Sequence, residues 1–171
     1  MLLQGFFKAG PSRRAGERLY AQLVERARAP ALYAGLGVPD TPDGRFEIYT
    51  LHVVLALERL EVGGPAAGAV AQALFDTYLS ALDHGLRELA VGDLSVGKTM
   101  RRLGEAFYGR RRAYAEALAK PPDRTELEAL IARTVFSASG ADPAPLADYV
   151  LTLRAELAAA ALDKLTAGEW E

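Results

Sequence analysis

The sequence feature that most constrains the fold is a helical pattern in residues 46–62 that is apolar on most of its circumference. One face carries Phe46, Thr50, Val53, Leu57 and Leu60, and another carries Ile48, Leu51, Leu55 and Val62. Such a helix is buried on nearly every side. Arg45 and Glu47 near its start and Glu58 and Arg59 near its end leave it too short to span a bilayer. The pattern therefore predicts a central core helix.

A rigid polar loop, residues 37–45, leads into this helix. Thr41 is the expected N-cap, because Pro42 suits the first helical position, and Asp43 is the alternative cap. Glycine in a helix costs about 1 kcal/mol relative to alanine, so we expect a close backbone approach at Gly44. A charged cluster stands at the start of the helix: Asp40, Asp43, Arg45 and Glu47. Capping and salt bridges explain this cluster as well as ligand binding does.

The rest of the chain also has helical patterns. Apolar residues recur at three- and four-residue spacing in residues 13–28, 66–90, 96–120 and 123–135, and an Ala/Leu-rich helix is expected from after residue 145 to about Thr166. No stretch alternates polar and apolar residues as a half-buried strand does. We predict an all-α single domain of six or seven helices over residues 13–167, with tails at residues 1–12 and 168–171.

The composition argues against several classes of function. With no cysteine and two histidines, the chain has no thiolate site and little capacity for a metal cluster, so we predict no metal, no cofactor and no catalytic residue. His52 lies within the apolar helix and is expected to be a buried histidine with satisfied hydrogen bonds, whereas His84 is expected at the surface. The net charge of −2 gives no general attraction to nucleic acid, and DNA is not an expected partner.

The N-terminal sequence MLLQGFFKAGPSRR places its apolar residues before its charges, which is the reverse of a secretory signal. We therefore expect a cytoplasmic protein. Two interpretations of Leu2, Leu3, Phe6 and Phe7 stay open at this point: a packed or frayed terminus, and peripheral contact with the inner membrane.

Residues 92–99, GDLSVGKT, match the P-loop pattern G-x-x-x-x-G-K-[ST]. In a P-loop, Lys98 would reach the terminal phosphates and Thr99 would bind magnesium. The motif requires a strand before the loop, yet the preceding residues have helical periodicity. We prefer a structural interpretation, in which Gly92 and Gly97 let two helices turn and Asp93 or Ser95 caps the second. A nucleotide-binding protein remains the alternative.

The segment that follows is locally basic. It carries six positive side chains and one negative one, Glu105; the positive ones are Lys98, Arg101, Arg102, Arg110, Arg111 and Arg112. A solvated helix face and a docking surface for RNA, lipid headgroups or an acidic partner fit this pattern equally well. A basic-helix module that binds RNA or the ribosome is therefore a second alternative.

Three stretches of the chain resemble the ubiquinol–cytochrome c chaperone family. They are ARAPALYAGLGVPDTPDGRFEIYTLHVVLALERL (residues 27–60), QALFDTYLSALDHGLRELAVGDLSVGKTMRRLGEAFYGR (residues 72–110) and YAEAL (residues 114–118). The strings GVPDT-x-DGRF and LRE-x-x-VGD-x-x-VGK are uncommon. The position of Thr99 is commonly basic in this family, so the resemblance implies that the P-loop match arose by chance. Without a transit-like extension, the chain resembles a bacterial member.

The resemblance implies a helical, non-enzymatic assembly factor that binds newly made cytochrome b. It leaves open contacts with the ribosome or with a small partner protein. It also implies candidate contact residues in two motifs. The first motif contributes Asp40, Asp43, Gly44, Arg45 and Phe46, and the second contributes Arg87, Glu88, Gly92, Asp93, Gly97 and Lys98.

Overall fold

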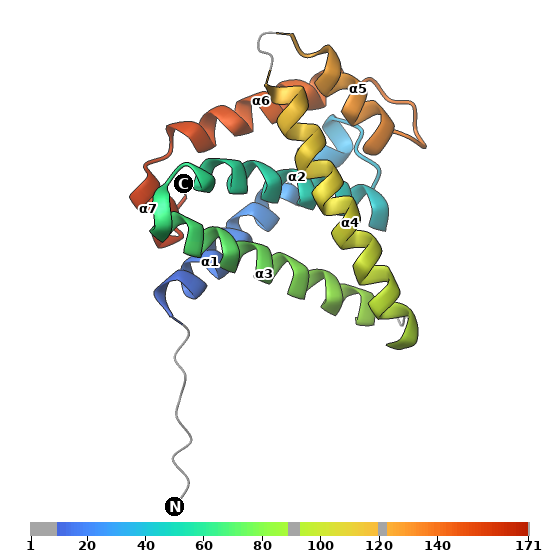
Figure 1. Ribbon diagram of the computed structural model, residues 1–171. Coiled ribbons are helices and arrows are strands. Elements are labelled where there is room, and N and C mark those ends of the chain that lie inside the picture. The colour runs from blue at the N-terminus through green and yellow to red at the C-terminus, as the bar shows by residue number, and fades with distance from the viewer. Residues whose placement is uncertain (1–9, 89–92, 120–122, 171) are drawn as a thin grey trace, which may run out of the picture.

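The computed structural model describes residues 10–88, 93–119 and 123–170, and these ranges contain seven α-helices, one π-helical turn and no strand (Figure 1). The helices are α1 (Pro11–Ala27), α2 (Pro42–Glu61), α3 (Gly64–Glu88), α4 (Asp93–Leu118), α5 (Thr125–Thr134), α6 (Ala144–Ala159) and α7 (Leu162–Ala167), and the π-helical turn is Ala31–Gly35. The predicted all-α fold is confirmed. No helix in the described ranges has the length and apolarity needed to cross a membrane.

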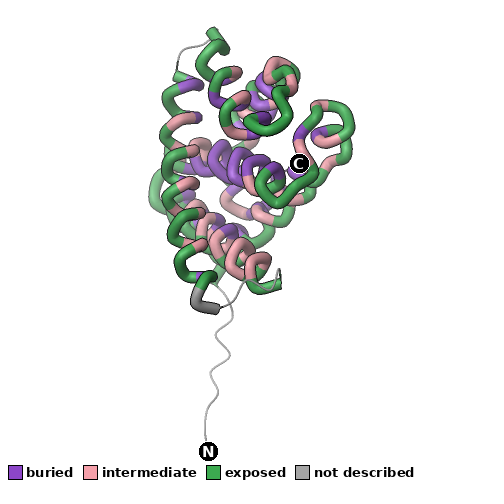
Figure 2. Tube along the Cα trace, turned by 90° about the vertical axis from the view of Figure 1, so that its right-hand side faces the viewer, coloured by how far each residue is buried: buried purple, intermediate pink, exposed green. Residues whose placement is uncertain are grey.

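Helix α2 is the centre of the molecule. Every residue from 50 to 57 is buried, and α2 contacts α1, α3, α4, α6 and α7. Figure 2 shows the buried residues gathered along this central helix, inside a shell of exposed and intermediate ones. The predicted core helix is therefore confirmed, and its apolar circumference is explained by neighbours on several sides.

The outer helices pack closely where small residues meet. A Cβ atom at Gly16 of α1 would lie 2.6 Å from the Cβ atom of Ala73 of α3, so glycine lets these two helices approach. At the other end of the chain, Gly168 has a φ of 73° and lies against the backbone of Ala15. Trp170 is buried, and the Arg26 guanidinium stacks 4.1 Å from the centre of its ring. The C-terminal residues thus close the fold against α1.

Two predicted boundaries are wrong. The expected single C-terminal helix is two helices, because Ala160 and Ala161 are extended, with ψ of 134° and 129°. Arg59 of α2 donates hydrogen bonds to the carbonyl oxygens of Leu157 and Ala160, at 3.1 Å each, and so satisfies backbone groups that the break exposes. In addition, α4 begins at Asp93, so Ser95, one of the two expected caps, and Gly97, expected to let two helices turn, lie inside this helix.

Helices α2 and α6 lie side by side and run in the same direction, whereas α4 crosses α2 (Figure 1). Helices α3 and α4 converge where residues 88 and 93 lie. We call residues 83–88 and 93–102 the α3–α4 corner.

Candidate functional site

The first candidate motif lies at the start of α2 and is held by its own backbone. The Thr41 side chain accepts a hydrogen bond from the Gly44 amide at 3.1 Å, so Thr41 is the N-cap, as predicted. A Cβ atom at Gly44 would lie only 2.1 Å from the carbonyl oxygen of Pro39. The expected close approach at this glycine is therefore confirmed, since any side chain here would collide with the loop.

The side chains of this motif mostly contact one another or the core. Arg45 Nε donates to Asp40 Oδ1 at 2.6 Å, and the Arg45 guanidinium lies 5.6 Å from the centre of the Tyr33 ring. Phe46 is partly buried against the core, and Asp43 is exposed in the first turn of α2. The structure thus gives four of the five candidates a role in the fold and leaves Asp43 facing solvent.

An ion pair joins Glu47, the residue after this motif, to α4. Arg110 donates two hydrogen bonds to the Glu47 carboxylate, at 2.8 and 2.7 Å. Glu47 is only 7% exposed, and its hydrogen bonds raise the pKa of Arg110. Because both donors face one carboxylate, the pair fixes the angle at which α4 crosses α2.

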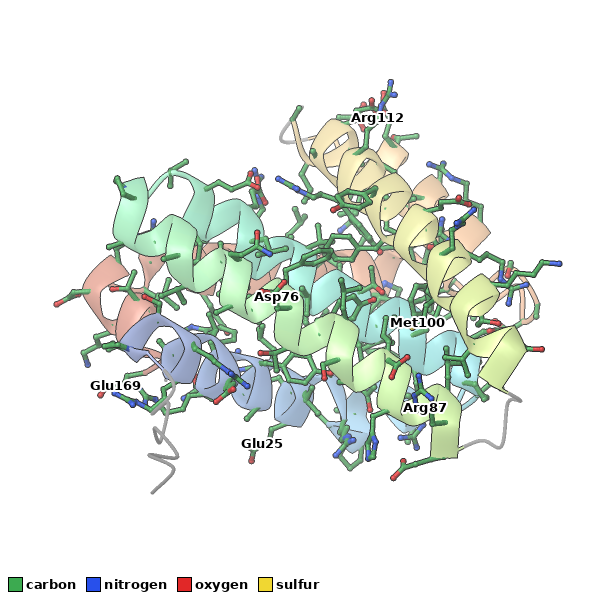
Figure 3. All side chains as sticks on the ribbon, turned by 60° about the horizontal axis from the view of Figure 1, so that its bottom comes forward. Glu25, Asp76, Arg87, Met100, Arg112 and Glu169 are labelled. Carbon is green, nitrogen blue, oxygen red and sulfur yellow. The ribbon has the colours of Figure 1, made fainter. Side chains whose placement is uncertain are left out.

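The neighbouring arginines of the predicted basic patch are also paired within the chain. Arg111 pairs with Glu61 at the end of α2, and Arg112 Nε pairs with Glu116 Oε1 at 2.8 Å. Figure 3 shows Arg112 reaching outward at the C-terminal end of α4. The predicted patch is therefore divided, because its C-terminal half takes part in internal ion pairs.

The second candidate motif lies at the α3–α4 corner, where Figure 3 places Arg87 near the end of α3 and Met100 on α4. Arg87 Nε lies 2.8 Å from Asp83 Oδ2, and this hydrogen bond lowers the pKa of Asp83. Glu88 and His84 form an exposed pair at 3.2 Å, which places His84 at the surface as expected. Asp93 is the first residue of α4, and Gly92 lies outside the described residues.

The N-terminal half of α4 presents a strip of charge to solvent. Lys98, Arg101 and Arg102 are exposed, and no described residue forms an ion pair with them. Gly97 is exposed as well, and a Cβ atom built on it meets nothing within 4 Å. We call Lys98, Arg101 and Arg102 the basic strip. Unlike Gly44, Gly97 has no neighbour in the described chain that requires glycine.

The structure does not support the P-loop alternative. The residues before the motif are helical up to Glu88, and Lys98 and Thr99 lie inside α4. A P-loop needs a strand that enters the loop and a helix that begins after it. Here α4 has already begun at Asp93, so the amide groups that would hold phosphate are part of a helix.

His52 is a buried histidine with both ring nitrogens bonded, as predicted. Its Nδ1 atom lies 2.8 Å from the Ile48 carbonyl oxygen, which can only accept, so Nδ1 carries the proton. Nε2 then accepts from the Tyr149 hydroxyl at 2.7 Å. Burial lowers the pKa of His52 to about 4 and keeps it neutral. No local pattern indicated Tyr149 as the partner, because it lies 97 residues away on α6.

The described chain is all-helical, with some candidate residues in internal ion pairs and others in an exposed basic strip. The sequence model of the ubiquinol–cytochrome c chaperone family matches residues 34–171. The chain therefore belongs to the ubiquinol–cytochrome c chaperone family. It is also similar to the crystal structure of the Cbp3 homolog from Brucella abortus, with 38% identity and a TM-score of 0.82, over 92% of this chain and 88% of that one.

No curated protein matches the chain. The comparisons give no support to a nucleotide-binding protein or to an RNA-binding module.

Proposed function

We propose that this protein is a non-enzymatic assembly chaperone that binds newly made cytochrome b and promotes assembly of ubiquinol–cytochrome c reductase. The observation that carries the proposal is the family match over residues 34–171, which includes both candidate motifs. The similarity to the Cbp3 homolog, which extends over nearly the whole chain, supports the same assignment.

The arrangement of charges suits a protein that acts by binding. Buried polar groups such as His52 and Glu47 are satisfied by internal partners, which favours a rigid scaffold. The α3–α4 corner instead presents the basic strip beside the exposed Gly97 and Glu88. We assign these corner residues, with Asp43, to contacts with the client or with a second partner. An acidic partner or the anionic surface of the inner membrane would be attracted to this strip.

The proposal is tested by affinity purification of the tagged protein from cells that are synthesising cytochrome b. We expect newly made cytochrome b to be enriched far above membrane proteins of similar abundance and hydrophobicity. The matched control is an equally tagged soluble helical protein from the same cells. Equal recovery of cytochrome b and of the unrelated membrane proteins would contradict the proposal, because a general affinity for apolar chains is not a specific chaperone function.

A further inference from the structure

A groove of about 390 Å³ lies between α2 and α6. One wall is formed by Leu55, Glu58 and Arg59 of α2 and by Val62, the residue that follows its last turn. The opposite wall is a strip of α6 with Leu151, Arg154, Ala155 and Ala158. Both walls have the spacing i, i+3, i+4, i+7, so each is one continuous helix face. Seven residues along a helix span about 10 Å, so the groove is about two helical turns long.

Apolar side chains that face solvent gather at this groove. Val62 is 78% exposed and Leu151 is 38% exposed, and among the described residues Tyr108 is the other large apolar side chain that is exposed. Ala155 and Ala158 are exposed on the same face of α6 as Leu151. A helix that is apolar toward the core and toward solvent normally has a neighbour on both sides. The outer face of α6 has no such neighbour in the described chain.

The charges around the groove are held by partners inside the chain. Arg154 donates to both oxygens of the Glu58 carboxylate, at 2.6 and 3.2 Å, and also to the Leu118 carbonyl oxygen at 3.2 Å. Arg59 is bonded to backbone carbonyls at the end of α6. The other charged residues of α6 are paired as well, Asp148 with Arg124 and Glu156 with Arg26. The groove therefore presents apolar surface without a free charge, in contrast to the basic strip on α4.

We propose that the α2–α6 groove binds one uncharged apolar helical segment of the client. This inference rests on the proposed function, because it names the part of the molecule that holds the client. Two parallel walls, one of them with small residues, match the recognition mode in which a helix lies in a hydrophobic groove and places side chains at i, i+3 or i+4 and i+7. A charged segment would not suit the groove, since its charge would be desolvated without a partner.

The size of the groove favours a single helix over a second copy of this chain. Nine residues line it, whereas a stable protein–protein interface uses about 20–30 residues on each side. Two helical turns suit a short segment of a longer apolar helix. The exposed alanines would also let a helix backbone approach α6 closely, which is how apolar helices pack against each other in membranes.

The test is site-specific photocrosslinking of the full chain to radiolabelled cytochrome b during its synthesis. Benzoylphenylalanine is placed at position 155, inside the groove, or at position 152, as the matched control. Thr152 is exposed on α6 and does not line the groove. We expect a strong crosslink to cytochrome b from position 155 and about tenfold less from position 152, since crosslinking requires direct contact. Raising the salt from about 0.05 M to about 0.5 M should leave the crosslink unchanged, because salt screens charges but does not weaken apolar burial.

Two substitutions make the result independent of the probe. Leu151→Glu should reduce capture of cytochrome b about tenfold, because it places a charge where an apolar helix binds, whereas Thr152→Glu should leave capture unchanged. Both side chains are already exposed, so both variants should fold with the thermal midpoint of the wild type. Ala155→Glu provides a second groove variant if Leu151→Glu fails to fold.

Each outcome has a distinct meaning. If the wild type captures cytochrome b and the folded groove variants capture it equally well, the groove assignment is wrong and the proposed function stands. Crosslinking of position 155 to a second copy of the chain, or to its own residues 1–9, would also overturn the assignment by identifying another occupant. If the wild type itself shows no enrichment of cytochrome b over unrelated membrane proteins, the proposed function fails and the groove assignment fails with it.

Discussion

The two candidate motifs differ in how the fold uses them. At the start of α2, Gly44 meets the Pro39 carbonyl, Arg45 meets Asp40 and Glu47 meets Arg110, so nearly every group has a partner. At the α3–α4 corner, Gly97 has empty space around it and the basic strip has no ion pair with any described residue. Two motifs that are equally distinctive in sequence can therefore have different roles in the structure. The first is tied into the scaffold, whereas the second includes an exposed basic strip, which we propose makes contacts outside the chain.

The largest expected loss of stability follows from removing the ion pair between α4 and α2. Arg110→Met leaves the nearly buried Glu47 carboxylate without its partner, and we expect the free energy of unfolding to fall by about 3 kcal/mol. Urea unfolding followed by circular dichroism measures this change. The matched control is Arg112→Met, whose exposed partner Glu116 lies on the same helix, and it should leave the urea midpoint unchanged. Equal losses in both variants would remove the distinction between internal and exposed arginines.

The two glycines provide the sharpest comparison of the motifs. Gly44→Ala places a methyl group against the backbone of Pro39 and should lower the free energy of unfolding by about 2–3 kcal/mol, as overpacking does. The measurement is again the urea midpoint. A variant with wild-type stability would show that the loop moves away at little cost, and that the first motif is not a rigid part of the scaffold.

Acid should weaken the core through His52. Its pKa is about 4 in the folded protein and about 6.5 in an unfolded chain, so the unfolded chain binds the proton more tightly and stability falls as the pH decreases through this window. Between about pH 7.5 and about pH 5 this histidine accounts for a loss of about 2 kcal/mol. His52→Gln retains a donor and an acceptor but does not titrate. Its unfolding free energy should therefore depend less on pH, and an identical pH dependence would contradict the assignment.

The smaller effects belong to the α3–α4 corner. Gly97→Ala should stabilise the protein by about 0.5–1 kcal/mol, because alanine favours a helix and meets no atom here. Thermal unfolding measures the gain. Destabilisation would mean that this glycine is required by the fold, as Gly44 is.

The basic strip should contribute least of all to stability. Lys98→Ala/Arg101→Ala/Arg102→Ala removes three exposed side chains that have no ion-pair partner in the described chain, so the unfolding free energy should stay within about 0.5 kcal/mol of the wild type. A loss comparable to that of Arg110→Met would show that the strip has an internal role and would make the two motifs alike.

Local patterns in the sequence were sufficient for several features of the structure. Three features that depend on neighbouring residues were predicted correctly: the apolar circumference of α2, the Thr41 cap and the close approach at Gly44. Features that depend on distant residues were not predictable. Tyr149 reaches His52 across 97 residues, and Arg59 satisfies carbonyls at the break between α6 and α7.

The candidate site shows the same limit. The basic patch was recognised as a run of charges, but its division into paired and unpaired halves depends on Glu47 and Glu61 of α2, which lie far away in the sequence. The α2–α6 groove had one signal in the sequence, the Ala/Leu-rich composition of the last helix. Its position relative to α2 depends on tertiary packing, so no local pattern defines the groove.

The proposed role of the protein in assembly of ubiquinol–cytochrome c reductase is tested most directly by following cytochrome b in cells that lack the gene. We predict that the absorbance of cytochrome b haem and the reductase activity are both lost, and that the wild-type gene restores them. A gene encoding Thr99→Arg should restore them equally, because Thr99 lies inside α4 and not at the end of a P-loop. Normal levels of cytochrome b and normal reductase activity in the deleted strain would contradict the account.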